Sequence, residues 1–303
     1  MKRIIIFTAI NFAVLIMLSI TTSIVASLFG ANLEELFGDY SNLAAFSLVF
    51  GFGGAMISLL ISKSMAKWTT GAQTITGDEG ETERWLVSTI EDLSRRANVK
   101  MPEVAIYPGA PNAFATGAFK NSALVAVSTG ILDGMRRDEL RAVLGHEMSH
   151  VTNGDMVTMC LAQGVLNVFV LFFSRVAATI VGNAMNGNSS RSRSSDRGGI
   201  AYYFLVRFFE MALGLIAAVI TCWFSRKREF AADAGSARLL GSPSPMIAAL
   251  RRLDDMSTGK LPDSMKAFGI ASPKRSESLF ATHPSIERRI EALQNLQFGD
   301  FTR

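Results

Sequence analysis

The stretch His146-Glu147-Met148-Ser149-His150 lies in the middle of the chain and decides how the rest of it is interpreted. On an α-helix, residues four positions apart lie on the same face, so His146 and His150 can direct two imidazole rings at one point. This is the H-E-x-x-H pattern, in which the histidines bind zinc and the glutamate takes a proton from water. The stretch therefore predicts a zinc site with Glu147 as general base.

The residues around this stretch favour a helix. Asp138 and Glu139 lie where a first helical turn favours carboxylates, and Gly154 is a typical stop. Between them, apolar residues recur at helical spacing: Leu140, Val143, Leu144 and Val151. A surface helix that carries two histidines by chance is the alternative. It is the weaker one, because the chain has 3 histidines and two of them lie in this motif.

Composition points to a membrane protein. Hydrophobic residues make up 49% of the 303 residues, and the net charge is +4. The basic residues are spread along the chain or lie beside apolar runs, so we predict no nucleic-acid partner. The 2 cysteines, Cys160 and Cys222, lie near the ends of apolar runs and are expected to be buried thiols rather than a disulfide.

Two apolar runs form a first predicted hairpin. The run 4–29 has no charge and exceeds the roughly 20 residues that span a bilayer, although a cleaved signal peptide is its alternative. The run 43–61 follows an acidic turn at 30–42. Because basic residues flank the outer ends of this hairpin, the positive-inside rule places residues 63 onward in the cytoplasm.

Two further apolar runs, 157–181 and 200–224, are interrupted by charged residues. A charge in the middle of a bilayer is costly unless it is paired or hydrated. Arg175 could pair with Glu210, and snorkelling or burial between helices are the alternatives. The segment 183–199 between these runs is a low-complexity loop of Ser, Arg and Gly. Whether this second hairpin crosses the membrane stays open, with crossing favoured.

These runs divide the chain into four segments. Residues 1–62 are predicted to form a transmembrane hairpin, and residues 157–225 are predicted to form the second hydrophobic hairpin. The segments 63–156 and 226–303 together form a cytoplasmic peptidase domain with helices and a small β-sheet. The predicted fold class is a mainly α membrane protein, with about four apolar helices and an α+β zinc peptidase domain.

A small sheet is predicted beside the metal-binding helix. Residues 81–97 have helical spacing, whereas 103–107 alternate like a strand and 123–128 form an apolar strand. The stretch 112–117, Asn112-Ala113-Phe114-Ala115-Thr116-Gly117, has two interpretations. It is either an ordinary hairpin turn or a sheet edge that binds an extended peptide by strand addition.

A catalytic zinc site needs a third protein ligand. No further histidine follows at a short spacing, so a carboxylate from a second helix is expected. Glu229 is our choice, with Asp233 four residues later on the same helical face. Asp233 could accept a hydrogen bond from a ligand imidazole. The alternative is a solvated helix face on which Glu229 pairs with neighbouring arginines.

His283 and Arg289 are candidates for contact with the reacting carbonyl. His283 precedes Pro284, which suits the first turn of a last amphipathic helix over about 284–296. A histidine and an arginine near a zinc ion could stabilise the oxyanion that forms when water attacks a peptide carbonyl. A loop histidine and a surface arginine are the alternative, which residue chemistry alone favours.

The combination resembles the gluzincin family of membrane metallopeptidases that includes the CAAX prenyl proteases. The matching residues, spread over nearly the whole chain, are Asn112-Ala113-Phe114 with Gly117, His146 to His150, Glu229 with Asp233, and His283-Pro284 with Arg289. The resemblance implies a gluzincin-like peptidase domain with one zinc ion per chain, and Glu229 as the third zinc ligand. It also implies that Asn112 marks a strand that binds substrate backbone, and that His283 and Arg289 lie near the scissile carbonyl.

The resemblance further implies an integral endopeptidase of the bacterial cytoplasmic (inner) membrane whose active site faces the cytoplasm. Its implied substrates are misfolded membrane proteins, which it would degrade under envelope or heat stress. The lipid bilayer is the other predicted partner. Natural substrates, cleavage preference, oligomeric state and the restraint on self-cleavage stay open.

Two other classes of function fit parts of the pattern. A non-catalytic metal sensor or scaffold would use a closed site of four Cys or His ligands, but two histidines alone are placed for this metal. A metal transporter would carry charges along an intramembrane path, but the metal-binding residues lie outside the apolar runs. A zinc endopeptidase is therefore the predicted function.

Overall fold

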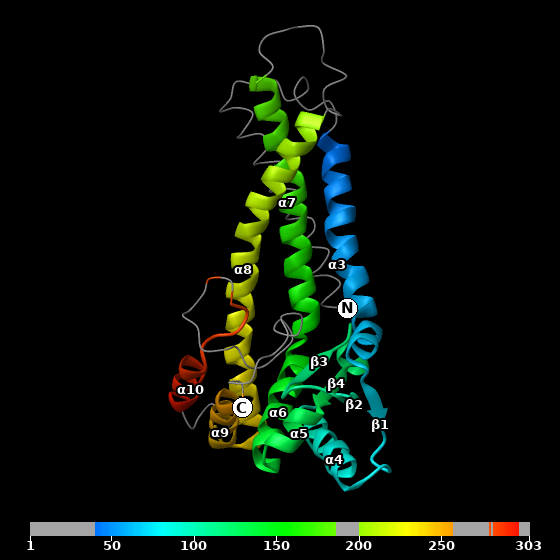
Figure 1. Ribbon diagram of the computed structural model, residues 1–303, viewed down its shortest axis with the longest axis vertical. Helices are drawn as coiled ribbons and strands as arrows, with labels where there is room; N and C mark the ends of the chain where they lie inside the picture. The colour runs from blue at the N-terminus through cyan, green and yellow to red at the C-terminus, as the bar shows by residue number, and fades with distance from the viewer. Residues whose placement is uncertain (1–39, 186–199, 257–278, 280, 297–303) are drawn as a thin grey trace. The chain divides into compact units, whose positions relative to one another are not determined.

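A computed structural model describes residues 40–185, 200–256, 279 and 281–296 (Figure 1). The predicted span at 4–29 and most of the loop at 183–199 lie outside these residues. The chain divides into two compact units, each built from two separate segments. Residues 1–57 and 160–220 make the first unit, and residues 58–159 and 221–303 make the second.

Three long helices are apolar enough to cross a membrane, by length and composition. They are α3 (Tyr40–Thr70), α7 (Asp155–Met185) and α8 (Ile200–Leu240). The helix α8 joins two stretches that the sequence suggests are separate, the apolar run at 200–224 and the helical stretch with Glu229. A change from apolar to polar residues does not end a helix that contains no Pro or Gly at that point.

Within the first unit, α3 packs closely on α7. Phe52 of α3 belongs to an apolar cluster with Val168, Phe172 and Val176 of α7. A Cβ atom on Gly51 would lie 2.7 Å from the Val168 Cγ2 atom, so the glycine permits this approach.

The charged residues in the apolar helices of the first unit are paired. Arg175 Nη1 lies 3.3 Å from Glu210 Oε1, and Arg207 Nη1 lies 2.6 Å from the other carboxylate oxygen. Arg175 also donates a hydrogen bond to the Leu171 carbonyl and lies over the Phe46 ring. Of the three alternatives for Arg175, the pair with Glu210 is therefore the one observed, and pairing reduces the cost of these charges.

The second unit contains a four-stranded sheet with the order β1-β2-β4-β3. Its strands are β1 (Gln73–Ile75), β2 (Glu103–Tyr107), β3 (Ala113–Thr116) and β4 (Leu124–Ser128). The strand β2 is parallel to β4, whereas β1 and β3 are antiparallel to their neighbours. The ambiguous stretch at 112–117 is thus mainly an edge strand, and no strand among the described residues pairs with its outer side.

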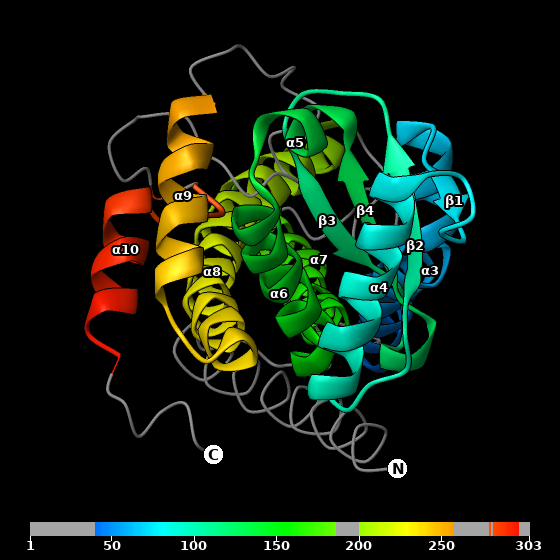
Figure 2. The same ribbon diagram turned by 90° about the horizontal axis from the view of Figure 1, so that it is seen from below.

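Helices cover both faces of this sheet. On one face lie α4 (Glu81–Arg96) and α6 (Arg137–Asn153), and α9 (Ser244–Met256) lies between α6 and α10 (Ile286–Gln294), as Figure 2 shows. The short helices η1 (Lys120–Ser122) and α5 (Thr129–Gly134) flank β4.

Alternation along β4 builds a core on each side of the sheet. Val125 and Val127 point toward α4 and α6, whereas Leu124 and Ala126 pack on the opposite face, together with Ala66 of α3.

The helix that carries the metal motif begins and ends where the sequence predicts. The Glu139 carboxylate accepts a hydrogen bond from the Arg136 backbone N–H at 2.9 Å, and Gly154 ends the helix with a φ of 68°. The last helix, predicted from about Pro284, begins two residues later. Ser285 is the N-cap, because its Oγ accepts a hydrogen bond from the Arg288 N–H, and the helix begins at Ile286.

Candidate metal centre

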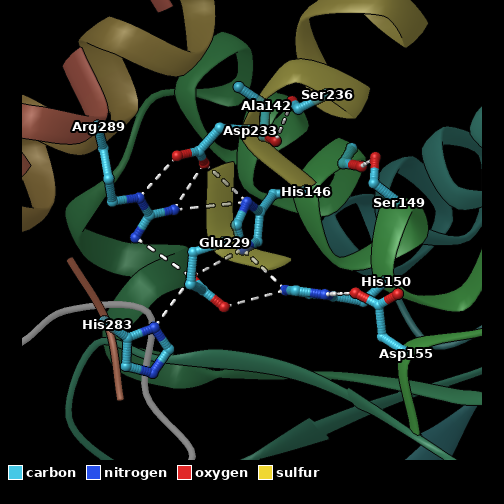
Figure 3. A network of polar contacts seen from close by, with 11 residues as sticks. Ala142, His146, Ser149, His150, Asp155, Glu229, Asp233, Ser236, His283 and Arg289 are labelled. Atoms are coloured by element: carbon cyan, nitrogen blue, oxygen red, sulfur yellow. Dashed lines mark hydrogen bonds and ion pairs between the residues drawn. The ribbon is translucent and has the colours of Figure 1, made fainter. Parts of the chain in front are cut away.

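Three side chains of the predicted zinc site meet where α6 and α8 cross (Figure 3). The ligand atoms of His146, His150 and Glu229 all lie within 4.8 Å of one another. The two Nε2 atoms are 3.1 Å apart, and their distances to the nearest Glu229 oxygens are 3.5 Å for His146 and 3.4 Å for His150. Two imidazoles and one carboxylate are the donor set of one class of catalytic zinc site.

One atom of this cluster argues for a bound cation. Glu229 Oε2 is buried and has no hydrogen-bond partner among the described residues. His283 Nδ1 lies 2.9 Å from it, but the contact does not have hydrogen-bond geometry. Arg289 Nη1 and His146 Nε2 lie 3.6 Å and 3.5 Å from the same oxygen, also without a hydrogen bond to it. A buried oxygen without a hydrogen bond is unfavourable by about 1–3 kcal/mol, which a metal ion at this point would offset. The residues present therefore fit a metal.

Small residues let α6 and α8 come close together. A Cβ atom on Gly235 would lie 2.4 Å from Ser149 Oγ, and one on Gly145 would lie 2.9 Å from Ser236 Oγ. Ser236 also donates a hydrogen bond to the Ala142 carbonyl at 2.7 Å. This close crossing holds the Glu229-bearing part of α8 beside the histidines of α6.

Gly235→Ala is expected to weaken folding and metal binding together. The added Cβ would lie 2.7 Å from Ser149 Cβ, so the helices must separate, and overpacking of this kind costs about 1–3 kcal/mol. Thermal unfolding in detergent and competition with a zinc chelator measure the two effects. Gly214→Ala, in the same helix with nothing within 4 Å of the added Cβ, is the matched control. Equal behaviour of the two variants would contradict a tight crossing.

A buried ion pair holds His146. The Nδ1 atom of His146 lies 2.9 Å from Asp233 Oδ1, and Arg289 donates to both Asp233 oxygens, through Nε at 2.8 Å and Nη2 at 2.6 Å (Figure 3). Burial lowers the pKa of His146, but its contacts with Asp233 and Glu229 outweigh burial and raise that pKa overall. The alternative that Arg289 is a surface arginine is wrong, because its side chain is completely buried.

Glu147 lies beside the candidate metal ligands and is almost completely buried. Burial raises the pKa of its carboxyl group, against the opposing effect of His146 and His150. The backbone of Ala115, in the edge strand β3, lies close enough to the carboxyl group to lower its pKa in turn. The sequence-predicted base thus lies near both the candidate metal ligands and the edge strand.

His150 has a carboxylate partner that the sequence pattern does not reveal. Asp155 Oδ2 lies 2.5 Å from His150 Nδ1, and Asp155 also forms an ion pair with Arg228. The available signal is Gly154, which suggests the end of α6. A left-handed glycine also turns the chain sharply, and this turn brings the next residue back against the helix end.

The structure brings His283 to the site and buries Asn112 at the start of β3. His283 lies next to Glu229, and the segment that carries His283 is held to α8 by Arg226, which donates to the Ala281 carbonyl at 2.6 Å.

The Asn112 backbone exchanges two hydrogen bonds with Ser128, both of 2.9 Å. Its side-chain Oδ1 has no hydrogen-bond partner in the described parts of the chain.

Residues 81–297, more than half of the chain, match the model of Peptidase family M48. The chain belongs to peptidase family M48. A "Protease HtpX homolog" from Verminephrobacter eiseniae is 54% identical to this M48 peptidase over 298 residues, which is 97% of this chain and 99% of the relative. One from Herminiimonas arsenicoxydans is 51% identical over 302 residues, with 98% and 100% covered. The predicted membrane metalloprotease is thus confirmed.

A solved structure shares the fold of this M48 peptidase. Ste24p from S. mikatae matches with a TM-score of 0.55 at 18% sequence identity, over 96% of this chain. The chain spans 65% of the length of that protein. At this identity the likeness shows the fold alone. Together with the apolar helices and the small sheet, it confirms the predicted fold class.

Proposed function

We propose that the metal of this M48 peptidase is zinc, one ion per chain, and that the enzyme is an endopeptidase acting on unfolded polypeptides. The observation that carries this proposal is the convergence of His146, His150 and Glu229, with the buried carboxylate of Glu147 beside them. That arrangement supplies three protein ligands and a general base, which is the machinery of zinc peptidases.

We further propose that the enzyme lies in the bacterial cytoplasmic membrane with its site facing the cytoplasm, and that damaged membrane proteins are among its substrates. Basic residues such as Lys63, Lys67 and the cluster 226–228 lie near the ends of the apolar runs, which supports this orientation. Apolar helices in the same chain would keep the site near segments that leave the membrane. We also propose a role in protein quality control under envelope or heat stress, which is what the resemblance to the gluzincin membrane peptidases implies.

His146, His150 and Glu229 would hold the zinc, and Asp233 would orient His146. When bound, zinc would polarise the scissile carbonyl and lower the pKa of water. Glu147 takes the proton of the attacking water and later gives it to the leaving amine. Because Glu147 is buried, this proton transfer is shielded from bulk water.

The substrate backbone would pair with the outer side of β3, which follows Asn112. The Ala115 backbone of this strand influences the pKa of the Glu147 carboxyl group and so lies near it, and an extended peptide added here would run past the base. His283, beside Glu229, is the residue that we expect near the oxyanion. We assign Arg289 to holding Asp233, in place of the predicted contact with the carbonyl, because its guanidinium is buried against that carboxylate.

Metal removal is expected to abolish cleavage of an unfolded protein such as casein, and added zinc is expected to restore it. The full chain would be purified in detergent with a chelator and titrated with zinc while cleavage and bound metal are followed. Activity should rise with bound zinc up to one ion per chain. Absence of cleavage at that loading, with a membrane protein as well as casein, would instead favour the metal sensor or scaffold.

A further inference from the structure

His146 and His150 each contact a carboxylate at Nδ1, and each of these carboxylates is paired with an arginine. His150 contacts Asp155 (Figure 3), and Asp155 pairs with Arg228. This repeats the arrangement of the ion pair behind His146, but with residues from the start of α7 and from α8. The second arrangement has no part in the proposed function described so far.

The two nitrogens of the His150 ring face different partners. Nδ1 lies 2.5 Å from Asp155 Oδ2, whereas Nε2 lies 3.1 Å from His146 Nε2 and 3.4 Å from Glu229 Oε1. A carboxylate next to Nδ1 keeps the ring proton there, so the neutral ring presents the lone pair of Nε2 to a metal. Asp155 therefore selects both the tautomer and the orientation of the ring.

Arg228 is the cationic partner of Asp155. The two side chains form an ion pair in which Arg228 is 13% exposed and Asp155 is 7% exposed. A carboxylate buried to this extent is stable when it is paired and unfavourable when it is alone. Arg228 directly precedes Glu229, the third proposed ligand, in α8. The ion pair therefore also links the first turn of α7 to this part of α8.

The backbone at Gly154 explains how Asp155 reaches His150. Gly154 has φ 68° and ψ 40°, in the left-handed region, and α7 begins at the next residue. Its N–H donates to the Val151 carbonyl at 3.1 Å, which closes the last turn of α6. A residue with a side chain is strained in this conformation. The turn thus places a first-turn carboxylate of α7 against the last histidine of α6.

We propose that Asp155, held by Arg228, is a positioning residue for His150 that raises the affinity of the site for a divalent metal and aligns it for peptide hydrolysis. Since it takes His150 as a ligand, this role rests on the proposed function.

Asp155→Ala tests the proposal in the full chain, with zinc and Co²⁺ as probes. We expect zinc affinity, measured by chelator competition, to fall about 10–100-fold, and the visible spectrum of the Co²⁺ form to change. Asp155→Asn keeps an oxygen that can accept the Nδ1 proton, so its loss should be smaller. Asp138→Asn is the matched control, because Asp138 lies in the first turn of α6 and its side chain is 64% exposed. This variant should change neither the zinc affinity nor the Co²⁺ spectrum.

A double-mutant cycle tests the link to Arg228. Arg228→Met should weaken zinc binding less in the Asp155→Ala background than in the wild type, because its effect passes through Asp155. Independent effects of the two substitutions would overturn this link. If Asp155→Ala does not fold, Asp155→Asn, which has nearly the same shape, tests the role by the smaller loss of zinc affinity that we expect from it. Wild-type zinc affinity and an unchanged Co²⁺ spectrum in that variant would then overturn the positioning role.

These experiments distinguish failure of the positioning role of Asp155 from failure of the proposed metal site. Wild-type zinc affinity and an unchanged Co²⁺ spectrum in both Asp155 variants would overturn the positioning role. His150→Ala should abolish tight zinc binding if His150 is a ligand. If His150→Ala also binds zinc normally, the proposed metal site itself is wrong. If it loses zinc while the Asp155 variants do not, the positioning role alone fails.

Discussion

Glu147→Gln is expected to abolish peptide-bond hydrolysis while the chain still binds one zinc ion. Glutamine has nearly the shape of glutamate, but it cannot take a proton from water. Loss of a general base typically lowers the rate about 10²–10⁴-fold, and the loss should appear in kcat rather than in KM. Glu147 is not one of the three side chains whose ligand atoms converge, so zinc should remain bound.

The measurement compares casein cleavage and bound zinc in the variant and in a matched control. Glu81→Gln makes the same change at a carboxylate that is 82% exposed and pairs with Arg137, so it should leave both unchanged. Full activity in Glu147→Gln with zinc bound would remove Glu147 from the mechanism. Loss of zinc together with activity would instead make Glu147 a metal ligand or a residue needed for folding.

The metal-binding helix could be predicted from the sequence because its requirements are local. Two histidines four residues apart share a helix face, and the start and stop signals lie within the same stretch. Glu229 lies in a different helix, but the chemistry of an incomplete site still points to it. The structure brings the candidate ligand atoms of all three residues within 4.8 Å of one another.

Other features depend on contacts that no local pattern contains. The stretch 112–117 becomes a strand because Ala113 pairs with Val127 of β4, a partner that the stretch itself does not specify. Asp155 reaches His150 through the left-handed turn at Gly154, a backbone conformation rather than a residue pattern. Arg289 is buried because α10 packs on α9 and turns one face toward Asp233, whereas residue type alone favours an exposed arginine.

Arg289→Ala is expected to cause the largest loss of stability among the substitutions considered. Arg289 is completely buried and donates to both oxygens of Asp233, which is 1% exposed. Its removal leaves a buried carboxylate without this partner, and breaking a buried pair in this way costs about 3–5 kcal/mol. Thermal unfolding of the zinc-free protein in detergent measures this loss apart from any effect on metal binding.

The neighbouring Arg288 provides the matched control, because its side chain is exposed on the same helix turn. Arg288→Ala should change the free energy of unfolding by about 0.5 kcal/mol or less.

Asp233→Asn combined with Arg289→Met then identifies the cause of the stability loss in Arg289→Ala. If the unpaired charge causes the loss, removing both charges should recover part of the stability, since replacing both members of a buried pair is far milder than removing one. A double variant as unstable as Arg289→Ala would assign the loss to packing of the long side chain instead.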